Sequence, residues 1–443
     1  MADRKLSLAQ EGWQRSFEER LQGHARLADL THFRSVATGP PRFVGGNHAF
    51  YVRDGRVQLA WILAAIRAAR SRVDLEMYIF DADATGVRVR DELVEATKRG
   101  VFVRVLYDSI GSGSAGHDFF EPIAEAGGQV LEFNPAAPWR LRMSRLGKLQ
   151  IWQPNARDHR KLLVCDAPRS FVDATARGFD PMPPDPSDGD DDGERTCLAI
   201  VGGRNIADHY LGHALGAGQW RDCGAVLMGP VVPQLAAMFD AMWAHSEGPD
   251  GAAPELTARP VGDIEILPLG SQPGFFNLIQ WAISRLASTV VSELRISCAY
   301  FIPSGRLRRA LALAAKRTGR CLVLLPKESD VPMVDSASRH LWGSLLRAGV
   351  RIHRYASNVL HEKTMVFDGV ATIVGSSNLD PRSFRLNYEL SVIILGASFA
   401  APVAAGHDAD LERSEPYTLA EWQSRPWNQK LSDWFWSLLR SQL

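Results

Sequence analysis

One short pattern occurs twice in this chain, and it constrains the fold more than any other feature of the sequence. The pattern is His-x-Lys followed, after four residues, by Asp; it starts at His159 and again at His361, 202 positions later, and a Gly-x-x-Asn follows each copy. A single short motif is weak support, but two copies with the same trailing residues are hard to ascribe to chance. The repeat predicts an internal duplication, with one motif contributed by each half.

The second copy predicts a hairpin in the sequence HEKTMVFDGVATIVGSSN. Strand alternation places His361 and Lys363 on one face and Asp368 on the other, so Asp368 is expected to make structural hydrogen bonds. The Asp-Gly pair is a signal for a two-residue turn, after which the returning strand would bring Ser376 and Asn378 back beside His361.

Both halves present the same order of helix and strand signals. VDLEMYIF and VFVRVLYD in the first half match LRISCAYFIP and CLVLLP in the second, with amphipathic helical stretches between them. Such alternation is typical of a parallel sheet covered by helices. We therefore expect an α/β fold of two pseudo-symmetric halves, each a mostly parallel sheet flanked by helices, that share one active-site cleft. The expected boundaries are 1–44 for a helical lead-in, 45–250 for the first half and 258–443 for the second.

The first half carries two insertions that the second lacks, over 134–158 and 168–195. The first interleaves large apolar side chains with the cations Arg140, Arg142, Arg145, Lys148 and Arg157. This stretch is expected to be either a basic rim that meets anionic lipid or an ordinary loop packed by its own apolar residues. The second contains FDPMPPDPSDGDDDGE, whose proline and charge density are typical of a disordered, solvated loop. A calcium loop is disfavoured there because the ligand spacing is missing.

Charge and cysteine content narrow the class of protein. Lys plus Arg and Asp plus Glu number 50 each, so no overall positive field favours nucleic acid. The five cysteines show no metal-ligand spacing and are expected to be buried thiols in a reducing compartment. No apolar run reaches the length of a membrane-spanning helix, so membrane contact is expected to be peripheral. The C-terminal WNQKLSDWFWSLLRSQL predicts an amphipathic helix that either packs on the body or anchors at a membrane interface.

Together these features resemble the phospholipase D superfamily, whose signature is a duplicated HxKxxxxD trailed by Gly-(Gly/Ser)-x-Asn. Over residues 45–443 the chain is similar to the cardiolipin synthases, above all in RDHRKLLVCD, VGGRNIADHYLG and VGSSNLDPRSFRLNYEL. It departs from those members that begin with transmembrane helices, because the mixed-charge start of this chain predicts none. The resemblance implies two phospholipase D-like halves and a reaction that needs neither a metal nor a cofactor.

The resemblance also implies the roles of the site residues. One histidine attacks phosphorus to give a phosphohistidine while the other serves as acid and then base; the resemblance suggests His159 and His361 in that order, which pseudo-symmetry leaves open. The motif residues predicted to form the catalytic set are His159, Lys161, Asp166, His361, Lys363 and Asp368. The predicted phosphate-binding and supporting residues are Asn205, Asn378 and Ser376, with Asp222 and Glu389 fixing the histidine tautomers.

The expected activity is transfer of a phosphatidyl group to the glycerol hydroxyl of another phospholipid. Phosphatidylglycerol is the expected substrate, phosphatidylethanolamine is a further candidate, and the expected place is the cytoplasmic surface of the inner membrane. Two rival activities use the same chemistry, namely hydrolysis that releases phosphatidate and cleavage of DNA or RNA. The neutral overall charge argues against a nuclease. The complete His, Lys and Asn sets argue against an inactive lipid-binding scaffold.

Overall fold

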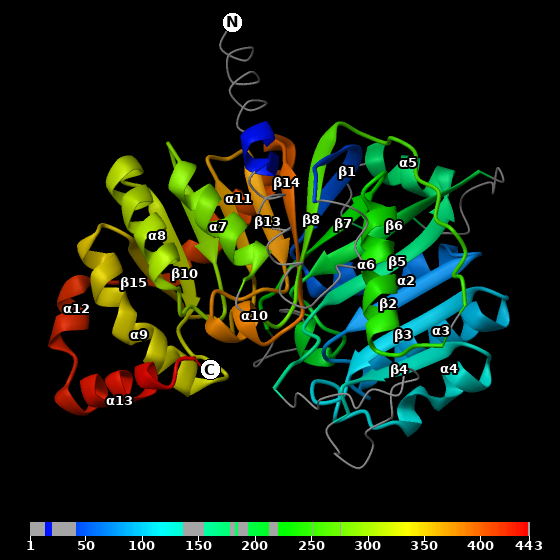
Figure 1. Cartoon of the computed structure of the whole chain (residues 1–443), viewed down its shortest axis with the longest axis horizontal. Coiled ribbons are helices and arrows are strands. Elements are labelled where there is room, and N and C mark those ends of the chain that lie inside the picture. Colours follow the sequence, from blue (N-terminus) through cyan, green and yellow to red (C-terminus); the bar gives the residue numbers. More distant parts are fainter. Residues whose placement is uncertain are drawn as a thin grey trace, which may run out of the picture.

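A single 15-stranded sheet runs through the whole molecule and is flanked by helices (Figure 1). The computed structural model describes residues 14–19, 41–135, 155–177, 182–184, 194–211, 220–249, 251–274 and 276–441. The strand order is β15-β11-β10-β9-β12-β13-β14-β8-β1-β7-β6-β5-β2-β3-β4.

The elements of the first half alternate along the chain. The strands are β1 (Val44–Val52), β2 (Arg72–Met77), β3 (Phe102–Asp108), β4 (Gln129–Phe133), β5 (Lys161–Pro168), β6 (Arg195–Gly202) and β7 (Gly224–Met228). The helices are α2 (Gly55–Ala68), α3 (Ala84–Lys98), α4 (Glu121–Glu125), α5 (Arg169–Arg177) and α6 (Val232–His245).

The second half repeats this order and adds a C-terminal extension. Its strands are β8 (Ile264–Ser271), β9 (Leu294–Ser297), β10 (Cys321–Pro326), β11 (Arg351–Tyr355), β12 (Thr364–Phe367), β13 (Ala371–Gly375), β14 (Glu389–Leu395) and β15 (Ser414–Tyr417). Its helices are α7 (Leu278–Thr289), α8 (Gly305–Thr318), α9 (Pro332–Arg347), α10 (Pro381–Arg385), α11 (Ala397–Leu411), α12 (Leu419–Ser424) and α13 (Trp427–Leu438).

The sheet itself displays the duplication. Counted outward from the central antiparallel pair of β1 and β8, one side reads β1-β7-β6-β5-β2-β3-β4 and the other β8-β14-β13-β12-β9-β10-β11. Each strand of the first half therefore has a counterpart in the second half at the same distance from the centre, and β15 is an additional edge strand beyond β11. The expected α/β fold with two pseudo-symmetric halves is confirmed.

Strand direction corrects one part of that expectation. Among the described strands, parallel pairing is confined to β2, β3 and β4 and to β9, β10 and β11. The strands nearer the centre pair antiparallel, because each motif strand returns as a hairpin, β5 with β6 and β12 with β13. Helix-strand alternation predicted the outer strands correctly and missed that the motif region switches to hairpins.

Local signals set the ends of several elements. The Asp54 carboxylate caps α2 by accepting from the backbone N–H of Arg56. Helix α8 starts at the Ser304 cap and ends at Gly319, whose φ is 64°. Asp368 and Gly369 have φ values of 52° and 68°, so both adopt the left-handed backbone that the Asp-Gly signal predicts, within a three-residue connection between β12 and β13.

The apolar core ties the two halves together. Helices α6 and α11 cover one shared cluster, in which Phe239 and Phe399 pack with Val164 of β5 and Val392 of β14. Residues 14–19 are helical, and Phe17 from this segment packs against the second half, with its ring centroid 5.2 Å from that of Trp281.

Further expectations concerned the cysteines, the two insertions and membrane-spanning helices. The five cysteines are buried and free. The 168–195 insertion begins with α5, which packs on the core through Phe171, whose ring centroid lies 5.8 Å from that of Trp61. Most of the acidic run, and residues 136–154 of the basic insertion, lie outside the described residues. None of the described helices has the length and apolar character needed to cross a membrane.

Candidate active site

The start of each motif strand is held by backbone from the other half. The N–H of His159 donates to the carbonyl of Tyr388 at 2.9 Å, and the N–H of His361 donates to the carbonyl of Arg221 at 2.8 Å. These are isolated β-bridges outside the regular strands. His159 thus lies where β14 of the second half begins, and His361 lies just before the start of β7 of the first half.

These backbone contacts place a carboxylate from the opposite half beside each histidine. Glu389 follows Tyr388, and its Oε2 lies 3.0 Å from Nδ1 of His159. Asp222 follows Arg221, and its Oδ2 lies 2.6 Å from Nδ1 of His361. An ionised carboxylate only accepts hydrogen bonds, so Nδ1 carries the proton and the lone pair of Nε2 is left for chemistry.

The two motif lysines lie buried beside their histidines. Lys161 Nζ donates to the His159 carbonyl at 2.6 Å, and the Lys363 ammonium donates to the His361 carbonyl. Burial, followed by the charges of Lys161, Lys363 and His361, holds the pKa of His159 well below its usual value. Groups from both halves therefore act on one imidazole, which means that the two motifs form a single cluster.

The asparagines after the hairpins occupy equivalent places. Asn205 Oδ1 accepts from the N–H of Ile79 at 3.0 Å, and Asn378 Oδ1 accepts from the N–H of Tyr300 at 3.3 Å. The Asn205 amide also donates to the hydroxyl of Tyr210 at 2.7 Å. No described residue accepts from Nδ2 of Asn378, so this amide is the freer of the two to donate to a phosphate oxygen.

The comparisons with known proteins agree with this geometry. The family described as "Cardiolipin synthase, PLD-like domain" matches residues 62–243 and 283–410, more than half of the chain. The chain belongs to this family. The cardiolipin synthase of Halalkalibacterium halodurans is 28% identical over 433 residues, which are 94% of this chain and 76% of that protein. Cardiolipin synthase A of Pseudomonas fluorescens is 30% identical over 381 residues, which are 84% of this chain and 71% of that protein.

A solved structure supports the fold. The crystal structure of phosphatidylserine synthase from Haemophilus influenzae Rd KW20 matches with a TM-score of 0.60 at 14% identity, covering 91% of this chain and 97% of that one. At this identity the likeness concerns the fold alone.

The motif aspartates of this cardiolipin synthase family member lie away from the histidines, and their carboxylates bind backbone N–H groups. Asp166 accepts from the backbone N–H of Ser71 at 2.9 Å and of Arg72 at 2.8 Å, and it pairs with Arg195. Asp368 accepts in the same way from the N–H groups of the loop before β9, including that of Ser292 at 2.7 Å. Both carboxylates fix the loop that leads from a helix into a core strand, and these contacts support a structural role for the two aspartates.

Ser376 also has a different role from the predicted one. Its hydroxyl donates to Glu389 and accepts from the N–H of Leu390 at 3.1 Å, contacts that position the carboxylate. The equivalent residue is Gly203, where an added Cβ would lie 2.5 Å from Oδ1 of Asp222. Asp222 therefore lies close to Gly203, whereas the longer side chain of Glu389 accepts a hydrogen bond from the Ser376 hydroxyl.

Aromatic rings line the cluster, and the sequence analysis did not assign them. Tyr78 lies with its ring centroid 4.8 Å from that of His159 and 4.9 Å from Nζ of Lys161. Around His361 lie Trp220, Tyr210 and Tyr300, with centroid distances of 5.0, 5.7 and 6.4 Å. Tyr78 directly follows β2 and Tyr300 lies three residues after the end of β9, so the tyrosines that end VDLEMY and SCAY were the available signal.

Burial favours the uncharged form of the ionisable groups in this cluster. It lowers the pKa of His361 to about 4 and that of Lys161 to about 7, and it raises the pKa of Glu389 to about 7. The pKa of Asp222 is lowered despite its burial, because Lys363 and His361 lie beside it. A phosphodiester anion entering this cluster would favour the charged lysines and one imidazolium.

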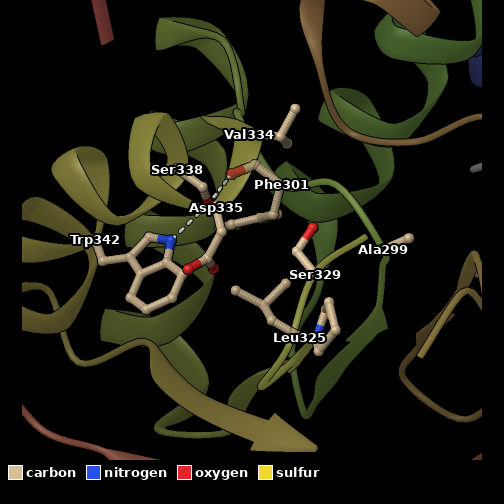
Figure 2. A pocket seen from close by; sticks show the side chains of 9 residues that line it. Ala299, Phe301, Leu325, Ser329, Val334, Asp335, Ser338 and Trp342 are labelled. Carbon is tan, nitrogen blue, oxygen red and sulfur yellow. Dashed lines mark hydrogen bonds between the residues drawn. The ribbon is translucent and has the colours of Figure 1, made fainter. Parts of the chain in front are cut away.

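A cavity of about 10 Å³ lies within the second half and has room for about one water molecule (Figure 2). Its lining includes Ala299, Leu325 and Trp342, and the indole of Trp342 donates to Ser338 at 2.8 Å. None of the motif residues lines it, so it is a packing defect between β9, β10 and α9 and not the catalytic centre.

Proposed function

We propose that this protein is a cardiolipin synthase-type phosphatidyltransferase. The observation that carries the proposal is the exchange of carboxylates, which holds Nδ1 of His159 and of His361 and leaves both Nε2 atoms for chemistry. Two such imidazoles with two buried lysines match a double displacement at phosphorus. The similarity to curated cardiolipin synthases over most of the chain favours lipid as the substrate.

In the first displacement, Nε2 of His159 attacks the phosphorus of a donor phospholipid. The new N–P bond forms as the bond to the headgroup oxygen breaks, and protonated His361 gives its proton to the departing alkoxide. Lys161, Lys363 and the Asn378 amide stabilise the charge on the equatorial oxygens. The products are a phosphatidyl-histidine and the free headgroup alcohol.

In the second displacement, neutral His361 removes the proton from the glycerol hydroxyl of an acceptor phospholipid. The acceptor oxygen attacks phosphorus, the N–P bond breaks, and His159 returns to its starting state. With phosphatidylglycerol as both donor and acceptor, the products are cardiolipin and glycerol. Water in place of the acceptor would release phosphatidate, so the choice of product lies in which hydroxyl reaches the intermediate.

Lipid analysis of the purified protein tests the proposal. Mixed vesicles of phosphatidylglycerol and phosphatidylethanolamine, with one lipid deuterated at a time, identify donor and acceptor by the mass of the product. We expect cardiolipin from the parent and none from His159→Ala or His361→Ala. Phosphatidate as the main product would make the protein a hydrolase, and no lipid product at all would overturn the proposal.

A further inference from the structure

Helix α13 shows its apolar face to solvent. Trp427, Leu431, Trp434, Phe435 and Leu438 recur at helical spacing, and Leu439 follows them. Trp427 is 77% exposed, and Trp434 and Phe435 are each 49% exposed. With 3.6 residues per turn, these side chains form one continuous stripe along the helix.

The polar side of the same helix is the one that packs on the protein. Asp433 is fully buried and accepts from Arg339 at 3.0 Å and from Arg425. Figure 1 shows α13 beside α9, the helix that carries Arg339. An amphipathic helix usually buries its apolar side. Here ion pairs hold the helix with that side turned outward, so hydrophobic packing on the body does not account for the stripe.

This outward stripe lies close to the catalytic cluster. Trp436, at the edge of the buried side, packs on the small apolar cluster around Ile302 and Val334, which Tyr300 also contacts. The ring of Tyr300 in turn faces His361 at a centroid distance of 6.4 Å. The small apolar cluster and the ring of Tyr300 therefore connect α13 to the acid-base histidine.

Unpaired cations flank the stripe at its C-terminal end. Arg440 follows α13, and its charge, with that of Arg309, adds to burial in lowering the pKa of Arg308, which places the three guanidinium groups near one another. None of the three has a carboxylate within ion-pair distance in the described part of the chain. A row of Trp, Phe and Leu beside arginines that have no carboxylate partner among the described residues is the composition that binds the headgroup region of an anionic bilayer.

We propose that the outward face of α13 docks into the interface of an anionic phospholipid bilayer and sets the catalytic cluster at headgroup level. This inference rests on the proposed function, because a lipid substrate is what brings the protein to a bilayer. The aromatic stripe supplies insertion, and Arg308, Arg309 and Arg440 supply attraction to anionic headgroups.

Vesicle co-sedimentation tests the docking separately from the chemistry. The triple variant Leu431→Ser, Trp434→Ser, Phe435→Ser should bind phosphatidylglycerol vesicles at least tenfold more weakly than the parent. The matched control is Val291→Ser, an apolar residue that is 70% exposed at the other end of β9, and it should bind like the parent. Changing Arg308, Arg309 and Arg440 to Gln should weaken binding only to anionic vesicles and flatten its salt dependence. Unchanged far-UV circular dichroism and melting temperature confirm that each variant is folded.

The outcomes separate this inference from the proposed function. If the triple variant binds vesicles like the parent while the parent makes cardiolipin, the docking inference is wrong and the function stands. If the parent binds through α13 and makes no cardiolipin, only the function falls. Sedimentation velocity tests the alternative that the apolar face of α13 binds a second copy of the chain. If the parent is a dimer and the triple variant is a monomer, α13 is a contact between copies and the inference is overturned.

Discussion

The two catalytic imidazoles occupy equivalent places but are held by unlike acids. Asp222 receives the N–H of Cys223 at 2.7 Å and lies close to Gly203, whereas Glu389 receives the Ser376 hydroxyl. Asp222 can reach His361 only if no side chain fills the space beside it, so its position depends on the glycine at 203. The position of Glu389 depends in the same way on the hydroxyl of Ser376.

Substitutions of Gly203 and Ser376 should therefore lower the rate by different factors. Gly203→Ala would push Asp222 off His361 and should lower kcat by about 100-fold, the cost typical of misplacing a catalytic group by an ångström. Ser376→Gly removes one hydrogen bond to a carboxylate and should lower kcat by about tenfold. Steady-state rates of both folded variants give the comparison, and equal losses would show that the two acids are held alike.

The pH profile should be narrow and centred near neutrality. Glu389, whose pKa is raised to about 7, must be ionised to orient His159, so kcat/KM rises as pH increases through that value. Lys161, whose pKa is lowered to about 7, must be protonated to bind phosphate, so kcat/KM falls above it. Glu389→Gln should lose the rising limb and, because the carboxylate raises the lysine pKa, move the falling limb to lower pH.

Asp222→Asn is the control for that profile. The pKa of Asp222 is already lowered, so this group stays ionised through the neutral range and contributes no limb there. The Asn variant should be less active yet keep both limbs near pH 7. Loss of the rising limb in Asp222→Asn would show that this limb reports Asp222 and not Glu389, and would contradict the prediction.

At this scale the sequence predicted which residues gather and missed what some of them do. The motif spacing was enough to place His159, Lys161, His361 and Lys363 together. It could not show that the Ser376 hydroxyl turns to Glu389, because that contact depends on a strand 13 residues further along the chain.

Among the elements, the motif aspartates are anchors for the loops that enter β2 and β9. Asp166 serves the α2-β2 loop and Asp368 the α7-β9 loop, each through several backbone N–H groups. Alternation along the hairpin predicted that Asp368 points away from His361, which the hydrogen bonds explain. Conserving the geometry of both loops requires an acceptor with two oxygens at these positions.

Asp166→Ala should destabilise the protein more than it slows the chemistry. Leaving buried N–H groups without an acceptor costs about 1–3 kcal/mol each, so we expect the free energy of unfolding to fall by about 3 kcal/mol. Urea unfolding measures this, with the exposed Asp91→Ala as control, expected within about 0.5 kcal/mol of the parent. A variant as stable as the parent but devoid of turnover would return Asp166 to the catalytic set.

The elements also show where sequence patterns stop being informative. The Asp-Gly signal correctly predicted the turn between β12 and β13. Helix-strand alternation could not reveal that the motif hairpins make the inner sheet antiparallel, because both arrangements use the same apolar strands. The amphipathic pattern of α13 predicted a helix, but its orientation follows from the distant ion pairs of Asp433 with Arg339 and Arg425.

Across the whole molecule, neither half holds a complete site. Each histidine depends on an acid from the other half, and Arg221 of the first half forms buried ion pairs with Glu362 at 2.9 Å and Asp410 at 3.0 Å in the second. The continuous sheet and the core shared by α6 and α11 hold the halves in one register. Duplication thus created two incomplete sites that are complete only together.

The most direct test of this account is to trap the covalent intermediate on one histidine. Phosphatidyl-p-nitrophenol carries a leaving group that needs no protonation, so His361→Ala should release one equivalent of p-nitrophenolate in a burst and then stall. Mass spectrometry of the protein, kept above neutral pH, should find the phosphatidyl adduct on His159. His159→Ala should give no burst. A burst from His159→Ala, or an adduct on His361 in the parent, would contradict the assignment.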